Sequence, residues 1–343
     1  MDGPEDERMK GCFVCKAGSG KLSYVYKMGR KEKFEAELEM PGEIITENNL
    51  EKHKAFLSET EVLAGTWDFI PFTAEQLGTY FPKAKLVLYG AGSVQAFARP
   101  FLERGIRIAS SWVAMSIPVM EMASSLVILA NKAYLPSLAM YKSKGFRASK
   151  DMSSTQFPGS FETKVGILGV GMIGSGVAKR LKQSRIEVLA YDPYLSDERA
   201  RELDIEKTSI ERIFSECQTI TNHMAHNSQT EGMLNYRLFS LMKDNATFVN
   251  TARGASVVEA DLIRALEEKP GRSAVLDVSW PEPVREGHPF LTMPNVFLSP
   301  HIAGYANQEV LRLADYMFDE LLRYKNKEKL EYEVTLPMLA TMA

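Results

Sequence analysis

VGILGVGMIGSGVAKRL, residues 165–181, is the stretch that decides the fold class of this chain. A short apolar segment runs directly into Gly169, Gly171 and Gly174, and a helical pattern follows. Gly169 allows a tight turn, Gly171 lets the backbone approach a pyrophosphate, and Gly174 lets the helix pack closely on the strand. The helix N-terminus offers free N–H groups to phosphate. The stretch therefore predicts a strand, a turn and a helix that bind a dinucleotide.

An acidic residue ends the next predicted strand. The segment EVLAYD, residues 187–192, closes on Asp192, at about the distance from Gly174 at which a ribose-binding acid is expected. A carboxylate there accepts a hydrogen bond from a free 2′-hydroxyl and repels a 2′-phosphate. No arginine follows it in PYLSDE, residues 193–198. We therefore expect NAD rather than NADP.

Strand-like and helical segments alternate over residues 10–111 and again from residue 164 onward. The predicted strands are 11–15, 62–67, 85–90, 105–110, 164–169, 187–192, 219–224, 246–252, 273–279 and 296–301. Helices are predicted over 73–81, 96–105, 118–133 and 306–325, and the polar segment 149–163, with its Pro and Gly, is predicted as a surface loop. Such alternation is typical of an α/β fold with parallel sheets covered by helices.

The composition excludes several classes of protein. The chain of 343 residues is long enough for two domains, and its formal net charge of −3 argues against nucleic acid and anionic membranes as partners. Three cysteines do not make a disulfide framework and indicate a reducing, cytoplasmic compartment. Cys12 and Cys15 form a C-x-x-C, but on a strand they point to opposite faces, so neither a disulfide nor a metal site is expected.

Two further segments are interpreted from their composition. The acidic, polar residues 1–8 are expected to be a disordered leader and not a signal peptide. The apolar segment 112–131 is interrupted by Pro118 and Glu121, so we expect a buried helix there and no membrane span.

Three polar residues follow strand-like runs and could carry chemistry. Arg253 follows ATFVNTA, Glu282 comes shortly after AVLDVSWP, and His301 follows VFLSP. In open parallel sheets, functional groups come from the carboxyl ends of the strands. A nicotinamide-dependent enzyme that acts on a carbonyl needs a cation to hold the substrate and a proton donor at its oxygen.

The second half of the chain resembles the D-isomer-specific 2-hydroxyacid dehydrogenases. NTARGASVVEADLIRALEE (250–268), LDVSWPEP (276–283) and HPFLTMPNVFLSPHIAGY (288–305) are similar to successive signatures of that family. With the glycine turn and Asp192, the resemblance covers roughly residues 160–305. It implies two Rossmann-like domains: a doubly wound NAD-binding domain, 112–304, inserted into a flavodoxin-like substrate domain, 9–111 and 305–343. It also implies a homodimer.

The resemblance assigns roles to single residues. Arg253 would bind the carboxylate and carbonyl oxygen of a small 2-oxo or 2-hydroxy acid, and His301 would exchange a proton with that oxygen. Glu282 would pair with His301 and orient it. Backbone N–H groups at Gly92 and Ser93 would bind the substrate carboxylate. The cofactor contacts would be Gly169, Gly171, Met172, Ile173, Gly174, Asp192, Met224, Thr251, Ala252, Asp277 and Gly304, with Asp277 at the nicotinamide carboxamide.

The resemblance leaves some questions open. Some relatives act as corepressors that sense NADH through the same fold, so a binding function is the alternative to an enzyme. A phosphoglycerate-type biosynthetic enzyme is a further alternative. Glu282 stands where formate dehydrogenases carry Gln, which favours a hydroxy acid over formate. His223, Met224 and Ala225 replace the usual His-x-Pro of the family.

Overall fold

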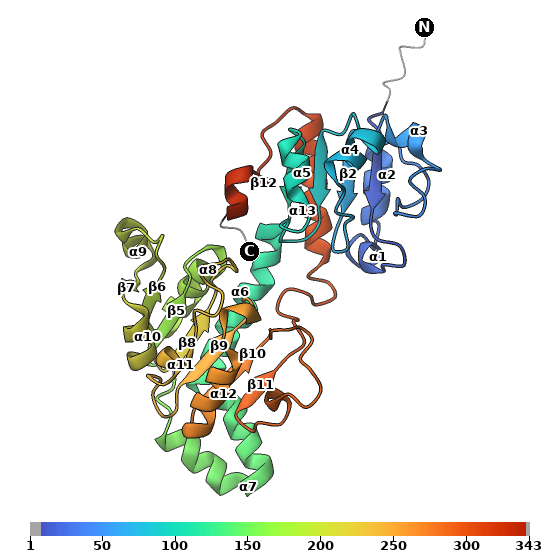
Figure 1. The fold of residues 1–343 in the computed structure, drawn as a ribbon. Coiled ribbons are helices and arrows are strands. Elements are labelled where there is room, and N and C mark those ends of the chain that lie inside the picture. The colour runs from blue at the N-terminus through green and yellow to red at the C-terminus, as the bar shows by residue number, and fades with distance from the viewer. Residues whose placement is uncertain (1–7, 341–343) are drawn as a thin grey trace. The chain divides into compact units, whose positions relative to one another are not determined.

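The computed structural model describes residues 8–340, which form two compact units (Figure 1). Of the described residues, the first unit contains 8–116 and 306–340, and the second contains Ile117–Tyr305. The second unit is therefore an insertion into the first along the chain. The predicted leader 1–8 lies, apart from its last residue, outside the described residues.

The first unit is built on a five-stranded sheet in the order β1-β2-β3-β4-β12. The strands are β1 (Gly11–Val14), β2 (Val62–Gly65), β3 (Leu86–Tyr89), β4 (Arg107–Ser110) and β12 (Glu333–Val334). The first four are parallel, and β12 is antiparallel to β4. Segment 39–45 adds isolated parallel bridges to the outer side of β1, at Lys10–Glu39 and Val14–Ile45. Together with this segment, the parallel strands follow the 2-1-3-4-5 order of flavodoxin-like folds, as predicted.

Helices cover both faces of this sheet. They are α1 (Lys21–Val25), α2 (Arg30–Glu37), α3 (Lys54–Leu57), α4 (Ala74–Tyr80), α5 (Ala98–Glu103) and α13 (Leu311–Lys325). One core contains Cys12 with side chains of α3, α4 and α5, and the other contains Cys15 with side chains of α1, α2 and α13. The two cysteines are free and buried on opposite faces, which confirms the prediction that they form no disulfide.

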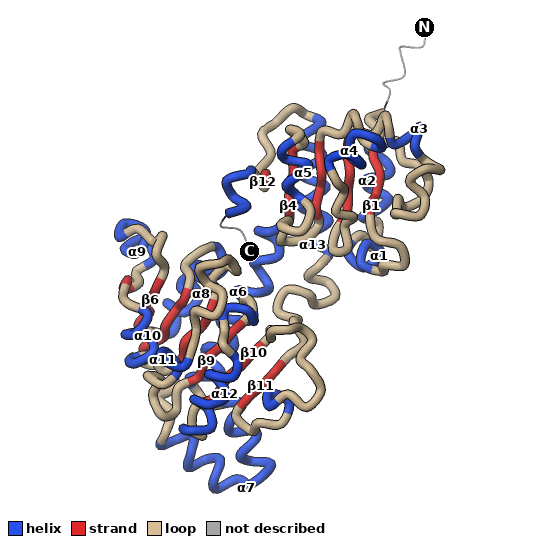
Figure 2. The backbone as a smooth tube through the Cα atoms, in the orientation of Figure 1, coloured by secondary structure: helices blue, strands red, loops and turns tan. Residues whose placement is uncertain are grey.

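The second unit is built on a seven-stranded sheet in the order β11-β10-β9-β8-β5-β6-β7 (Figure 1), and Figure 2 shows its strands in red. The strands are β5 (Lys164–Leu168), β6 (Glu187–Tyr191), β7 (Glu206–Lys207), β8 (Thr219–Asn222), β9 (Thr247–Asn250), β10 (Ser273–Leu276) and β11 (Val296–Leu298). Every pairing is parallel. The chain order reverses between β5 and β8, and such switch points are where doubly wound folds bind nucleotides.

Helices also cover both faces of the second sheet. They are α6 (Trp112–Asn131), α7 (Tyr134–Thr155), α8 (Met172–Leu181), α9 (Asp197–Leu203), α10 (Ile210–Glu216), α11 (Tyr236–Phe239) and α12 (Glu259–Glu268). Side chains of α6, α8 and α9 pack in one core, and those of α10, α11 and α12 pack in the other. This two-sided covering explains why the strands are almost continuous apolar runs.

Each predicted strand is present, but two predictions about segments are wrong. The surface loop predicted over 149–163 begins only after α7, because residues 149–155 continue that helix. Their polar composition reflects exposure: Ser154 and Thr155 donate to helix carbonyls one turn earlier. The helix predicted from residue 306 begins at Leu311 instead, after a run of turns.

Helix α6 is the described helix that is long and apolar enough to cross a membrane by length and composition. Half of its most apolar window is buried inside the structure. Within the second unit, Met120 packs so closely on α8 that a Cβ at Gly176 would lie 1.7 Å from its Sδ. This packing is that of a core helix.

Candidate active site

The predicted catalytic residues follow three neighbouring strands of the second unit. Arg253 follows β9, Glu282 lies on the loop after β10, and His301 follows β11. These strands are adjacent in the order β11-β10-β9. Because they are parallel, the three residues emerge at the same edge of the sheet, which we call the carboxyl edge.

His301 and Glu282 form a hydrogen-bonded pair. The Nδ1 atom of His301 lies 2.8 Å from Oε1 of Glu282, and the side chains are 45% and 42% exposed. The pairing leaves Nε2 of His301 available to a substrate, because no partner for that atom is found in residues 8–340. His301 has a φ of +54°, a left-handed conformation that non-glycine residues rarely adopt.

Asp277 holds the loop that carries His301. Its buried carboxylate accepts hydrogen bonds from Ser299 Oγ at 2.6 Å, Ile302 N at 2.9 Å and Ala303 N at 2.9 Å. The donors lie before and after His301 in the sequence, so these bonds account for its unusual backbone conformation. The contact of Asp277 with a nicotinamide carboxamide stays a prediction, whereas its anchoring of this loop was not anticipated.

Arg253 is largely buried beneath the carboxyl edge. One guanidinium nitrogen, Nη1, donates to the carbonyl oxygen of Ala252 at 2.8 Å. Burial lowers the pKa of Arg253, and the nearby carboxylate of Glu282 opposes that shift. A guanidinium keeps its charge in proteins even so. Arg253 therefore presents a partly desolvated cation, which attracts a carboxylate more strongly than a solvated one does.

The glycine turn has the geometry that a pyrophosphate requires. Gly169 has a φ of +83°, and a Cβ there would lie 2.8 Å from Met224 N. A Cβ at Gly174 would lie 2.0 Å from the carbonyl oxygen of Gly169, so only glycine lets α8 pack so closely. A Cβ at Gly171 would instead enter open space. Gly169 and Gly174 thus have the predicted roles in the turn and in the packing of α8, and the contact of Gly171 with a pyrophosphate stays a prediction.

The start of α8 is open to an anion. Gly171 is its N-cap, and no side chain caps the helix there. Met172 is 41% exposed, whereas Ile173 packs on the apolar core beneath. The first N–H groups of this ten-residue helix therefore face outward with the positive end of the helix dipole.

Asp192 lies beside the glycine turn. Its Oδ2 accepts from Val170 N at 2.7 Å, and its Oδ1 accepts from Tyr194 N at 2.8 Å. Each carboxylate oxygen has a further lone pair for a ribose hydroxyl. Asp192 is thus held in the position that the sequence predicts for a ribose-binding acid.

The remaining predicted cofactor residues follow β8, β9 and β11. Met224 N donates to Asn222 Oδ1 at 3.2 Å, and Ala252 N donates to Asn250 Oδ1 at 3.1 Å. Thr251 has a buried hydroxyl with no hydrogen-bond partner in the described part of the chain. Gly304 comes directly after the loop that Asp277 anchors. The hydrogen bonds of these two backbone N–H groups to Asn222 and Asn250 were not predicted from the sequence, although each asparagine ends a strand.

The donor set fits a dinucleotide. Along the sheet, Asp192, the glycine turn, Met224, Thr251 and Asp277 follow the adjacent strands β6, β5, β8, β9 and β10. The open space over Gly171, the uncapped helix and the unpartnered hydroxyl of Thr251 offer groups that an extended ligand would satisfy. The first unit holds the other predicted residues: Gly92 and Ser93 follow β3, and Ser110 Oγ donates to Gly92 O at 2.7 Å.

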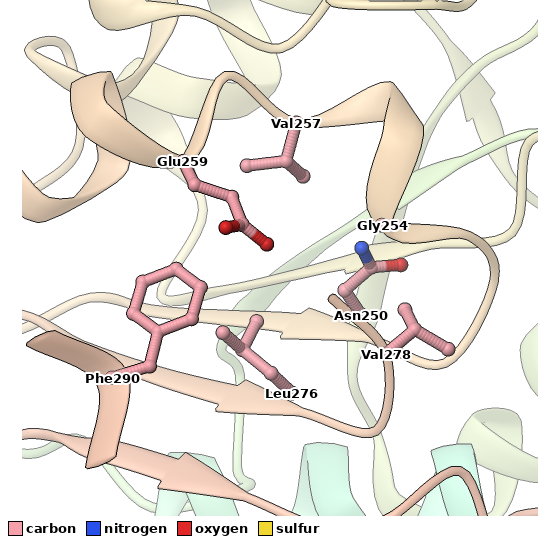
Figure 3. A pocket seen from close by; sticks show the side chains of 7 residues that line it. All are labelled: Asn250, Gly254, Val257, Glu259, Leu276, Val278 and Phe290. Carbon is pink, nitrogen blue, oxygen red and sulfur yellow. The ribbon is translucent and has the colours of Figure 1, made fainter. Parts of the chain in front are cut away.

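A small pocket lies under the loop that carries Glu282. Figure 3 shows its lining residues, Asn250, Gly254, Val257, Glu259, Leu276, Val278 and Phe290. It has no room for a ligand, but Glu259 is a polar group among mostly apolar neighbours. Sequence reasoning gave this residue no role.

Comparisons with known proteins agree with this arrangement. A family model described as D-isomer specific 2-hydroxyacid dehydrogenase, NAD binding domain, matches residues 125–303, more than half of the chain. D-3-phosphoglycerate dehydrogenase of Archaeoglobus fulgidus is 29% identical over 237 residues, covering 69% of this chain and 44% of that protein. Glyoxylate reductase/hydroxypyruvate reductase of Homo sapiens is 31% identical over 203 residues, covering 59% of this chain and 62% of that protein.

A solved structure supports the fold. The apo form of D-mandelate dehydrogenase from Rhodotorula graminis matches with a TM-score of 0.78 and 19% identity, over 95% of this chain and 97% of its own. The fold and the glycine turn define a protein with a Rossmann-type NAD-binding domain. The chain belongs to the D-isomer specific 2-hydroxyacid dehydrogenase family, and residues 125–303 are its NAD-binding domain. The chain spans only 37–44% of the length of several curated relatives.

Proposed function

We propose that this protein is an NAD-dependent oxidoreductase that interconverts a small 2-oxo acid and a D-2-hydroxy acid. The observation that carries the proposal is the hydrogen-bonded pair of His301 and Glu282, which shares the carboxyl edge of an NAD-binding domain with Arg253. The pair supplies a proton, and the arginine supplies a cation for an acid substrate.

His301 acts as the general acid and base. Glu282 accepts a hydrogen bond from the Nδ1–H group of His301. This bond turns Nε2 of the ring toward the substrate. In reduction, Nε2 of the protonated imidazole donates to the carbonyl oxygen, and in oxidation it removes the hydroxyl proton. The nicotinamide cofactor, when bound, would supply a hydride as NADH in reduction and accept one as NAD⁺ in oxidation. Glu282 stabilises the charged imidazole and holds the ring in orientation.

Arg253 binds the substrate. Its Nη1 atom donates to the carbonyl oxygen of Ala252, and the other edge of the guanidinium binds the acid substrate. A guanidinium can donate two parallel bonds, here to the carboxylate and the carbonyl oxygen. The positive charge also polarises the carbonyl. Gly92 and Ser93 of the first unit stay predicted ligands of the substrate carboxylate through their backbone N–H groups.

Residues along the carboxyl edge hold the cofactor. The N–H groups at Gly171, Met172 and Ile173 bind the pyrophosphate, and Asp192 binds the adenosine ribose, which favours NAD over NADP. Met224, Thr251, Ala252, Asp277 and Gly304 contact the nicotinamide half.

The test is a substrate panel. NADH oxidation is followed at 340 nm with glyoxylate, hydroxypyruvate, pyruvate, a branched-chain oxo acid and a phosphorylated oxo acid, in the wild type and in His301→Ala. Turnover that the variant loses supports the proposal and ranks the substrates. The phosphorylated acid tests the phosphoglycerate alternative. NADH binding without turnover of any acid would contradict the proposal and favour the NADH-sensing alternative.

The assembly and compartment belong to the same proposal. We propose a homodimer that forms through α7, because apolar side chains on this helix and just after it are 45–61% exposed: Tyr134, Leu138, Tyr141, Phe146 and Phe161. The three cysteines are free and buried, which is consistent with a cytoplasmic protein.

A further inference from the structure

The loop that carries Glu282 is held by only a few contacts. Ser279 packs on Gly254, where a Cβ would lie 2.2 Å from the Ser279 carbonyl carbon. Ser279 Oγ donates to the carbonyl oxygen of Pro281 at 3.1 Å. Glu282 itself is exposed, and its recorded hydrogen bond within residues 8–340 is the one to His301. The position of Glu282 therefore depends on what holds the backbone just before it.

Glu259 provides that support from beneath. Its Oε1 accepts a hydrogen bond from Trp280 N at 2.8 Å, two residues before Glu282. Its Oε2 lies 3.2 Å from Nε2 of His288, and the two side chains are only 13% and 21% exposed. Glu259 thus joins the Glu282 loop to the segment that leads into β11.

The hydrogen bonds of His288 fix its protonation pattern. Its Nδ1 accepts from Phe290 N at 3.3 Å, so the proton lies on Nε2, the atom that is 3.2 Å from Oε2 of Glu259. The carboxylate of Glu259 therefore has a hydrogen-bond donor at Oε1, in Trp280 N, and an N–H group of His288 close to Oε2. It is also the first residue of α12, where the helix dipole favours a negative charge.

The side chain of Trp280 cannot replace this bond. The indole is 58% exposed, and its contact with the ring of His226 has a centroid distance of 6.1 Å. A charge-assisted bond to a half-buried carboxylate holds a backbone more firmly than such a contact. Figure 3 shows Glu259 directed into the pocket among its lining residues.

We propose that Glu259 is a positioning residue that keeps the Glu282 carboxylate against His301 by fixing the backbone of Trp280. The inference rests on the proposed function for its consequence in catalysis, but the positioning itself is measurable without turnover. Within residues 8–340, Glu259 has no hydrogen bond or ion pair with His301, Glu282 or Arg253, so its effect on them passes through the loop. His288 is its partner and keeps the carboxylate oriented.

The direct test is spectroscopic and uses the full-length protein. Histidine is labelled with ¹⁵N, and the Nδ1–H proton of His301 is assigned by its loss in His301→Gln. In Glu259→Ala this proton signal is expected to weaken or move upfield, and the Trp280 amide is expected to exchange with solvent at least about tenfold faster. Glu259→Gln keeps an acceptor for Trp280 but turns an N–H group toward His288, so its effect is expected to be smaller.

A matched control lies on the same helix. Glu268 is exposed and bonds to Arg264 and Tyr236, so Glu268→Gln should change neither the His301 signal nor the Trp280 exchange rate. If Glu259→Ala fails to fold, Glu259→Met, which removes both acceptor oxygens and keeps most of the side-chain volume, takes its place. A His301 signal and a Trp280 exchange rate equal to those of the wild type in a folded variant that lacks both oxygens would overturn the inference.

Kinetics then separate positioning from binding. With the panel's best substrate, kcat of Glu259→Ala is expected to fall roughly tenfold, while KM for NADH stays within about twofold. A rise in KM for NADH with unchanged kcat would also contradict a positioning role. A wild-type protein without turnover on any acid would overturn the proposed function, and the spectroscopic result would still decide the role of Glu259.

Discussion

His301 and Glu282 illustrate how far two residues depend on their neighbours. The imidazole is directed by a 2.8 Å hydrogen bond to Glu282, and the backbone that presents it is held by Asp277. The chemistry is that of the two side chains, but their geometry comes from a buried carboxylate that makes no contact with the ring itself. Substitutions of His301 and Asp277 should therefore have different signatures.

Replacing His301 removes the proton donor and leaves the cofactor site intact. We expect His301→Gln to lower kcat by roughly 10²- to 10⁴-fold, the usual range for loss of a general acid or base. The affinity for NADH, measured by fluorescence titration, should stay the same. A variant that keeps wild-type turnover would exclude His301 from proton transfer.

Asp192 is the residue proposed to favour NADH over NADPH. Asp192→Asn keeps an acceptor for one backbone N–H group but removes the negative charge that repels a 2′-phosphate. We expect the ratio of the Kd values for NADPH and NADH to fall about tenfold, equivalent to about 1.4 kcal/mol. If the wild type already binds NADPH more tightly than NADH, the cofactor prediction is wrong.

At the scale of elements, the segment of β5, the glycine turn and α8 contains glycines that the fold requires and one glycine that the proposed cofactor would require. Gly169 and Gly174 are required because other atoms occupy the space that a Cβ would take. A Cβ at Gly171 would enter open space, so only the proposed cofactor would require glycine there. The glycines of this one motif are therefore required for different physical reasons.

These reasons predict opposite outcomes for two matched variants. Gly174→Ala forces α8 away from the turn and should destabilise the protein by at least about 1–3 kcal/mol, with a lower Tm. Gly171→Ala should leave Tm nearly unchanged and raise the Kd for NADH at least about tenfold. Calorimetry and NADH titration on both proteins provide the check. Equal effects of the two variants on Tm would contradict the assignment.

Helix α7 is an element whose length the composition of the chain does not predict. Its second half is polar and resembles a loop, yet it continues as a helix beyond a break at Gly145, which has a φ of +82°. Its exposed apolar side chains are unusual for a surface helix, and they motivate the proposed dimer.

At the scale of the whole molecule, the dimer has a direct test. We expect the wild type to sediment as a dimer at micromolar concentration and a Leu138→Glu, Tyr141→Glu double variant to sediment as a monomer. The control is Met28→Glu, which changes a still more exposed apolar residue of the first unit. A monomeric wild type, or a double variant that stays dimeric, would refute the proposed interface.

The acid stability of the fold depends on His223. Burial lowers the pKa of this histidine to about 3, and its Nδ1 has no hydrogen-bond partner in residues 8–340. Below pH 6.5 the unfolded chain binds a proton that the folded chain rejects, so stability is lost as pH falls from about 6.5 to 3, by up to roughly 4 kcal/mol.

Removing the titrating group should reduce this loss. We expect His223→Gln, whose amide can still bond to Thr221, to unfold at a lower pH than the wild type in acid titrations followed by circular dichroism. His53, a partly buried histidine of the first unit that is paired with Glu43, provides the control through His53→Gln. An unchanged or higher unfolding pH in His223→Gln would contradict the assignment.

The sequence by itself determined the fold class, the strands and the residues that follow them. Apolar runs and glycine spacing are local signals, and the rule that parallel strands end at one edge brings Arg253, Glu282 and His301 together without further information. The order of the strands was decided only by the tertiary structure, which pairs β5 with β8 and so brings Met224 to the glycine turn. The supports of the site, Asp277 under His301 and Glu259 under Trp280, were also visible only there. The physical reason is that a hydrogen bond between a side chain and a backbone far along the chain leaves no periodic pattern in the sequence, whereas burial of a strand or a helix does.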